Sequence, residues 1–305
     1  MIGGGKTVAG KSERSGHAAM FLFAAIISVS FSLGDRAAPH IAPAALTSAR
    51  FAIAAVVIGT LALPSMRWAH FRAAWRYLAV GGLLAAYFIL MFEALRLTDP
   101  VSTSAVFTLT PIMTAMFGYL LMRQITTPEM AFALVLAGLG SIWVIFRADL
   151  EAMLGLQLGP GERMFFVGCA LHAIYVPVGR LWNRGEPMLV YTFGGVCGGF
   201  LVAFAYGFND VMATDWAALP TVAWAAILYL AVFATAITFF LTQFASLRLP
   251  SAKVMAYGYL VPSFVILWEG LFAGDWVAPV VWIGAAMTVA ALLILLRSQP
   301  ARLSA

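Results

Sequence analysis

Charge is what this sequence has least of. Only 10% of its 305 residues are Asp, Glu, Lys or Arg, whereas soluble domains carry about 25%. A water-soluble fold with so few charges would be unable to cover its surface, and 63% of the chain is hydrophobic. Intrinsic disorder is excluded for the opposite reason, because disordered chains combine low hydrophobicity with high net charge. The composition therefore predicts a protein that uses lipid as its solvent.

Cysteine and catalytic motifs are also scarce. The two cysteines, Cys169 and Cys197, both lie in apolar runs, which excludes a disulfide framework or metal-ligand spacing. The chain has no phosphate-binding loop, HExxH or CxxC motif, and the glycines at 3–5 lie in a polar N-terminal segment. The net charge of +5 forms no basic stripe. We therefore expect no enzyme, no cofactor, no metal and no nucleic-acid partner.

Long apolar runs are what the sequence has in abundance. A bilayer-spanning helix needs about 20 mostly apolar residues. Ten stretches qualify, which predicts an all-α polytopic membrane protein; they are 17–35, 43–63, 76–95, 100–121, 128–146, 163–182, 187–208, 219–246, 251–272 and 277–297. The first follows Lys6, Lys11 and Arg14, as a signal sequence would. A cleaved signal would leave nine spans and break the internal pairing below, so we expect a retained helix.

The basic residues predict the topology. Thirteen of the eighteen Lys and Arg fall on the side of the N-terminus, four fall on the other side, and Arg50 lies inside a span. Because cytoplasmic loops are rich in Lys and Arg, both termini are predicted to be cytoplasmic. The expected location is a bacterial-type inner (plasma) membrane.

Two segments of the chain read alike. They are FEALRLTDPVSTSAVFTLTP at 92–111 and FASLRLPSAKVMAYGYLVP at 244–262, and each ends on a proline inside a span. The repeat unit holds five helices, an odd number, so the two halves must cross the membrane in opposite directions. Inverted repeats are typical of secondary transporters, whose substrate site lies near mid-membrane. The alternative is an old duplication retained for stability.

The repeat divides the chain into five parts. We expect an N-terminal tail at 1–16, a first repeat at 17–146, a linker at 147–162, a second repeat at 163–297 and a C-terminal tail at 298–305. Both tails are predicted to be cytoplasmic.

Several short motifs occur in an order that resembles a known family. The sequence is similar to the ten-helix EamA-type members of the drug/metabolite transporter superfamily, over about 17–297. The matching motifs are Arg50-Phe51, Ala94-Leu95, Pro111, Pro262 and Gly274-Asp275, the last in place of the family's Gly-Glu. Arg123-Gln124 departs from the pattern at the equivalent position of the first half. The resemblance implies two five-helix halves around a central cavity and the export of metabolites, with the amino-acid branch, aromatic substrates included, the one we favour.

The two mid-helix prolines are the first candidates for the site. Pro111 and Pro262 each remove a backbone donor and should leave a free carbonyl four residues earlier, at Phe107 and Gly258. In lipid such a carbonyl must face protein or a water-filled cavity. We therefore expect both kinks at the cavity. The alternative is a kink satisfied by a neighbouring Ser or Thr.

Helical spacing adds neighbours to these prolines. Hydroxyls, amides and aromatic faces suit an amphipathic metabolite, and residues three or four apart share a helix face. Among the tyrosines we favour Tyr175 and Tyr259 over Tyr87. The predicted substrate-binding residues are Ser104, Thr108, Pro111, His172, Tyr175, Thr235, Thr238, Tyr259 and Pro262.

Titratable groups inside the membrane are costly and suggest function. We assign gating or coupling to Arg50, Glu269 and His172. His172 would titrate and couple export to protons, or bind substrate while neutral; the alternative is a neutral histidine bonded to another helix. Arg50 is expected to pair with Glu93 or Glu269 as an outer latch, against the alternative that these carboxylates reach the membrane surface.

These observations favour one function over its rivals. We predict a secondary transporter that exports small metabolites by alternating access: amino acids, aromatic or otherwise hydrophobic, or amphiphilic drugs. Its partners would be the substrate, the lipid bilayer and protons. An importer or exchanger remains the alternative within transport. An intramembrane enzyme would need a catalytic partner for His172, and a scaffold would have no use for buried charges.

Overall fold

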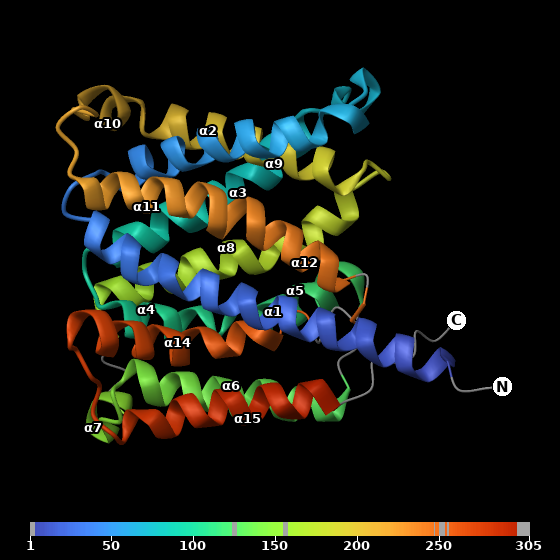
Figure 1. Ribbon diagram of the computed structural model, residues 1–305. Helices are drawn as coiled ribbons and strands as arrows, with labels where there is room; N and C mark the ends of the chain where they lie inside the picture. Colours follow the sequence, from blue (N-terminus) through green and yellow to red (C-terminus); the bar gives the residue numbers. More distant parts are fainter. Residues whose placement is uncertain are drawn as a thin grey trace.

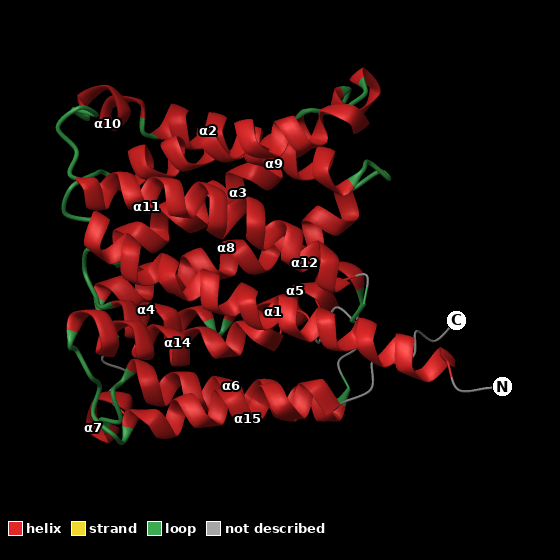
Figure 2. Ribbon diagram, viewed as in Figure 1, coloured by secondary structure: helices red, strands yellow, loops and turns green. Residues whose placement is uncertain are grey.

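The computed structural model describes residues 4–123, 127–154, 158–246, 248–249, 254 and 256–297. Within these ranges the secondary structure is helical, with no strand (Figure 2). The first repeat contains α1 (Gly4–Ala37), α2 (Pro43–Ala62), η1 (Leu63–Ser65), η2 (Trp68–Phe71), α3 (Trp75–Ala94), α4 (Pro100–Phe107), α5 (Thr110–Met122) and α6 (Pro128–Ile145). The rest contains α7 (Leu150–Leu154), α8 (Pro160–Trp182), α9 (Met188–Tyr206), α10 (Phe208–Ala213), α11 (Thr221–Ala231), η3 (Val232–Ile237), α12 (Thr238–Ser246), η4 (Tyr257–Leu260), α14 (Val261–Trp268), η5 (Glu269–Ala273) and α15 (Val281–Arg297).

The predicted helical membrane fold is confirmed. Eight helical segments of the described chain are long and apolar enough to cross a membrane, and two shorter apolar helices, Tyr257–Ala273 and Val281–Arg297, follow them. The fourth predicted span is divided into α4 and α5, and the eighth contains the π-helical turn η3. Helix α1 begins at Gly4, inside the segment expected to be a tail, while the other predicted tail, 298–305, lies outside the described residues.

Prolines and polar caps explain where the helices begin. Proline has no backbone N–H and a φ angle suited to helix entry, so it favours the first turn. Pro43, Pro100 and Pro128 each open a helix. Asp99 caps α4 by accepting a bond from the Ser102 N–H, at 2.9 Å. The short loop between the end of α3 and Pro100 allows α3 and α4 to run antiparallel.

The helices of the two halves pack in a reciprocal pattern (Figure 1). Helix α8, the first long helix of the second half, packs against α3 and α5; helix α1, its equivalent, packs against α12 and α14. Two further contacts, α2 with α9 and α6 with α15, join equivalent helices directly. The start of α1 and the end of α15 lie on the same side of the bundle (Figure 1).

Helices α3 and α9 approach so closely that glycine is required between them. A Cβ added to Gly198 would overlap the Tyr77 backbone carbonyl, and one added to Gly81 would overlap the backbone of Gly195 and Gly199. These obstacles are main-chain atoms, which cannot rotate aside. The contact therefore fixes the first half against the second along this pair of helices.

Candidate functional site

Both predicted proline kinks are breaks in the helix, and they lie close together. Helix α4 ends at Phe107, and α5 carries Pro111 in its first turn; η4 is followed by α14, whose second residue is Pro262. A Cβ on Gly258 would lie 3.8 Å from the Phe107 ring, so the two breaks face each other. The prediction of a free carbonyl at Gly258 is wrong, because this carbonyl accepts a hydrogen bond from the Val261 N–H in a 3-10 turn.

A histidine from the second half lies against this meeting point. The His172 ring on α8 lies 4.6 Å from Tyr87, 6.0 Å from Phe107 and 5.9 Å from Tyr175, measured between ring centroids. We call Tyr87, Phe107, His172 and Tyr175 the central cluster. His172 is half-buried, and its covered Nδ1 has no hydrogen-bond partner among the described residues. The cluster thus offers three aromatic faces and one ring nitrogen to which no described residue bonds.

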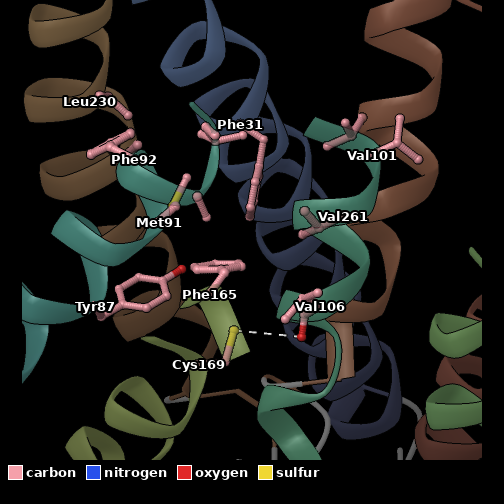
Figure 3. Close-up of a cluster of buried hydrophobic side chains, with 14 of the residues drawn as sticks. Phe31, Tyr87, Met91, Phe92, Val101, Val106, Phe165, Cys169, Leu230 and Val261 are labelled. Carbon is pink, nitrogen blue, oxygen red and sulfur yellow. Dashed lines mark hydrogen bonds between the residues drawn. The ribbon is translucent and has the colours of Figure 1, made fainter. Parts of the chain in front are cut away.

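Apolar side chains pack around Tyr87, one member of the central cluster (Figure 3). The Phe165 ring lies 5.7 Å from Tyr87 and 6.2 Å from Phe31. Cys169, one turn before His172 on α8, donates a weak bond to the Val106 carbonyl at 3.7 Å. These contacts connect α1, α3, α4 and α8 beside Tyr87.

Arg50 is buried beside the central cluster. Its side chain is 1% exposed, and its guanidinium lies over the Phe88 ring, 3.6 Å from the centroid. Its Nε donates to Thr235 Oγ1 at 3.0 Å, and its Nη2 donates to the Ala234 carbonyl at 3.3 Å. Both acceptors lie in the π-helical turn η3, the kind of irregularity that is frequent at functional sites. Phe88 contacts Tyr87, with ring centroids 4.7 Å apart, so Arg50 is connected to the cluster through adjacent rings.

The expected pairing of Arg50 with a carboxylate is not what the structure shows. Glu93 pairs with Arg96 at 3.4 Å, near the end of α3. Glu269 pairs with Arg36 at 3.8 Å, and its Oε1 has no hydrogen-bond partner among the described residues. The guanidinium of Arg50 instead contacts the Phe88 ring of α3 and bonds to Thr235 and Ala234 of η3.

The remaining predicted residues are dispersed. Thr108 bonds to Ser141 of α6, and Ser104 donates to the Val101 carbonyl of its own helix. Thr238 donates to the Thr235 carbonyl at 3.3 Å. Tyr259 is fully buried in a different hydrophobic group, which contains Met20, Ala133, Ala137, Leu292 and Leu295. Helical spacing did not indicate which neighbour each of these residues meets.

Tyr87 and Phe88 were not among the residues that the sequence predicted for the site. Tyr87 contacts His172 directly, although Tyr259 was favoured over it, and Phe88 carries the guanidinium of Arg50. The available signal was the position of both in the middle of the third span. It was too weak to separate them from lipid-facing aromatics, because aromatic residues are also common at membrane surfaces.

Comparison with known proteins identifies the family. The model of the EamA-like transporter family matches the chain twice, at residues 14–146 and 159–297. The chain belongs to this family, within the drug/metabolite transporter superfamily. It is 22% identical over 247 residues to "Uncharacterized transporter YyaM" of Bacillus subtilis (strain 168), covering 79% of this chain and 80% of that protein. A solved structure titled "Crystal structure of protein" matches 93% of this chain and 96% of its own, with TM-score 0.67 and 18% identity, which supports the fold alone.

The two family matches correspond to the two halves of the bundle. Each includes one long opening helix, α1 or α8, and one broken helix that contains a proline. Membership makes this EamA-like protein a transporter of small molecules across a membrane, and not an enzyme.

Proposed function

We propose that the chain exports small amphipathic metabolites, hydrophobic amino acids among them, by alternating access around the central cluster. The observation that carries this proposal is the meeting of the two broken helices, at Phe107 and Gly258, beside the unbonded Nδ1 of His172. Transporter sites are typically formed by discontinuous helices at the interface of inverted repeats. The central cluster has this construction, with groups from both halves.

The chemistry of the cluster suits a ligand with an apolar body and a polar end. The rings of Tyr87, Phe107 and Tyr175 supply apolar faces, while His172 Nδ1 supplies one hydrogen-bonding position. The breaks at Pro111 and Pro262 provide points at which each half can bend. We propose that bending at these points exposes the cluster to one side of the membrane and then the other, with His172 or Glu269 as the group that exchanges protons.

The direction of transport depends on orientation. The start of α1 and the end of α15 lie on one side (Figure 1). The segments that the sequence predicts to lie on the side of the N-terminus carry thirteen of the eighteen Lys and Arg. Because basic loops remain in the cytoplasm, we propose that both termini are cytoplasmic, in the inner membrane, and that substrate leaves on the side of α7 and α10.

Transport by the full chain in proteoliposomes tests the proposal. Labelled L-phenylalanine, L-leucine and an amphiphilic cationic dye are supplied with and without a pH gradient. We expect flux of at least one of them. His172→Gln should weaken binding of the transported compound about tenfold, the effect of one lost hydrogen bond of about 1.4 kcal/mol. His40→Gln, an exposed histidine in the loop between α1 and α2, is the matched control.

The possible outcomes separate the parts of this proposal. No flux of any probe by correctly inserted protein would contradict the proposed substrates. Flux that His172→Gln leaves unchanged would remove the central cluster as the binding site. Loss of the response to a pH gradient in His172→Gln, with flux retained, would assign proton exchange to this histidine.

A further inference from the structure

Arg50 is a buried cation for which the described structure supplies no counter-ion. No carboxylate of the described residues lies within 4.0 Å of its guanidinium, and its side chain is 1% exposed. An arginine in a protein is always charged, and a charge inside a membrane is costly unless it is paired. The Phe88 ring offsets part of this cost through its negative face. The remaining requirement is for an anion.

One nitrogen of the Arg50 guanidinium has no hydrogen-bond partner among the described residues. Thr235 and Ala234 occupy Nε and Nη2, on the side of η3. Nη1 is fully covered and has no hydrogen-bond partner among the described residues. Guanidinium groups bind carboxylates through two parallel N–H groups, so Nη1 and the second N–H of Nη2 form a suitable fork. The bonds to η3 fix the orientation of this fork, which is the preorganisation that a binding site needs.

The architecture of the repeat does not require an arginine here. With Pro43 at the start of α2 aligned on Pro187 before α9, the position of Arg50 is occupied in the second repeat by Gly194. That glycine packs directly on the Tyr77 ring. The aligned position of the second repeat thus carries no charge, so the charge of Arg50 is not a shared feature of the two repeats.

Loosely packed space reaches the same part of α2. A groove of about 440 Å³ lies between α2, α9, α10 and α11, and its lining includes Ala49 and Ile53. Ile53 is one helical turn from Arg50, and Ala49 directly precedes Arg50 in the chain. The groove therefore lies within one helical turn of Arg50 along α2.

We propose that Arg50 binds the carboxylate of the transported molecule, whose apolar part then lies along Phe88 and Tyr87 toward His172. This inference rests on the proposed function and narrows its substrate class to acids with an aromatic or aliphatic body. Three contacts trace this path through the protein. Arg50 Cζ lies 3.6 Å from the Phe88 ring centroid, the Phe88 and Tyr87 centroids are 4.7 Å apart, and the Tyr87 and His172 centroids are 4.6 Å apart. The role of Arg50 is substrate recognition. The proposed substrate class excludes cationic drugs that have no acid group.

Three probes with the same ring separate the two ends of the ligand. L-Phenylalanine has both an amine and a carboxylate, 3-phenylpropionate has only the carboxylate, and phenethylamine has only the amine. Equilibrium binding of each is measured on the full-length protein in detergent. We expect the two acids to bind and phenethylamine to bind at least tenfold more weakly. Arg50→Gln should weaken the acids about 10–100-fold, the effect of one charge-assisted bidentate contact, and remove the preference for acids.

Matched variants separate recognition from folding. Arg248→Gln is the control, because the Arg248 guanidinium also lies over a phenylalanine, 3.5 Å from the Phe244 ring, yet at the end of the bundle near the termini. Arg50→Lys keeps the charge without the fork and should retain part of the preference for acids. Thr235→Val keeps the guanidinium but removes its Nε acceptor, so it should weaken acid binding even where Arg50→Gln does not fold.

Each outcome decides between the two proposals. If the wild-type protein binds phenethylamine as tightly as 3-phenylpropionate, or if Arg50→Lys, Arg50→Gln and Thr235→Val all keep the wild-type preference, the assignment of Arg50 is overturned while transport stands. If the cationic dye is transported and none of the three probes binds, the acid class is overturned and transport again stands. Absence of flux for every compound overturns both.

Discussion

The two ends of the bundle are held together by different electrostatics. On the side of the termini, Arg76 of α3 and Glu186 of the loop between α8 and α9 form an ion pair at 2.6 Å, with 3% and 5% of their side chains exposed. Arg76 also donates to the Trp182 carbonyl. On the far side, Arg36 of α1 and Glu269 lie 3.8 Å apart, and 38% of the Arg36 side chain is exposed. Both pairs connect the two halves, but only the first is short and covered.

The chemistry of Glu186 shows how firmly the first end is held. Burial alone would raise the pKa of Glu186, but hydrogen bonds from the Arg76 side chain and the Arg184 backbone hold it below its ordinary value of 4.5. Because this pKa is depressed in the folded protein, the pair contributes its stability above about pH 4.5 and loses it as the pH falls further. The Arg76–Glu186 contact therefore persists throughout the physiological range.

The ion pairs at the far end are more exposed than the Arg76–Glu186 pair. The pKa of Asp99 is also lowered: burial would raise it, but the Ser102 N–H and the charge of Arg147 outweigh burial. That ion pair is 62% exposed on the arginine side, so water and salt screen it. The 440 Å³ groove lies here as well, lined by residues of α10 and of the first half of α2. We infer that ion pairs hold this conformation more firmly on the side of the termini.

The largest effect is expected from breaking the covered pair. Arg76→Ala leaves the Glu186 carboxylate buried without its partner, which in other proteins costs about 3–5 kcal/mol. We expect a corresponding fall in the free energy of unfolding, measured in detergent, and faster labelling of a cysteine placed on the side of the termini. The double variant Arg76→Met/Glu186→Leu should recover most of the stability, because it leaves no unpaired charge. A single variant as stable as wild type would contradict the comparison of the two ends.

A smaller effect is expected from separating α3 and α9. Gly198→Ala places a Cβ against the Tyr77 carbonyl, next to Arg76, and should cost about 1–3 kcal/mol through overpacking. Gly195→Ala, three residues earlier on the same helix, has no atom within 4 Å of the new Cβ and should be nearly neutral. Equal melting temperatures for the two variants would show that the close contact does not hold this end of the bundle.

The sequence predicted the architecture better than the site, for a physical reason. Long apolar runs, capping prolines and the odd-numbered repeat are local or periodic signals, and lipid leaves helices as the solution for each run. The site depends instead on which helix faces meet. His172 and Tyr175 were predicted as site residues from their depth in the membrane, and Arg50 from the cost of burying its charge. The partners of Arg50, Phe88 and Thr235, come from opposite halves of the chain. Arg50 and Thr235 are 185 positions apart, and no rule of helical spacing predicts a contact between them.

The smallest effect on stability is expected at the far end. Arg36→Ala removes one partner of a 3.8 Å pair that is already in contact with water, so the free energy of unfolding should change by at most about 1 kcal/mol. Labelling of a cysteine placed near α10 should nevertheless become faster, since this contact connects α1 with η5 across the two halves. Arg96→Ala, whose pair with Glu93 lies within the first half, is the control and should leave labelling unchanged. A stability loss as large as that of Arg76→Ala would mean that both ends are locked equally, and the difference between them would then have no bearing on which side opens.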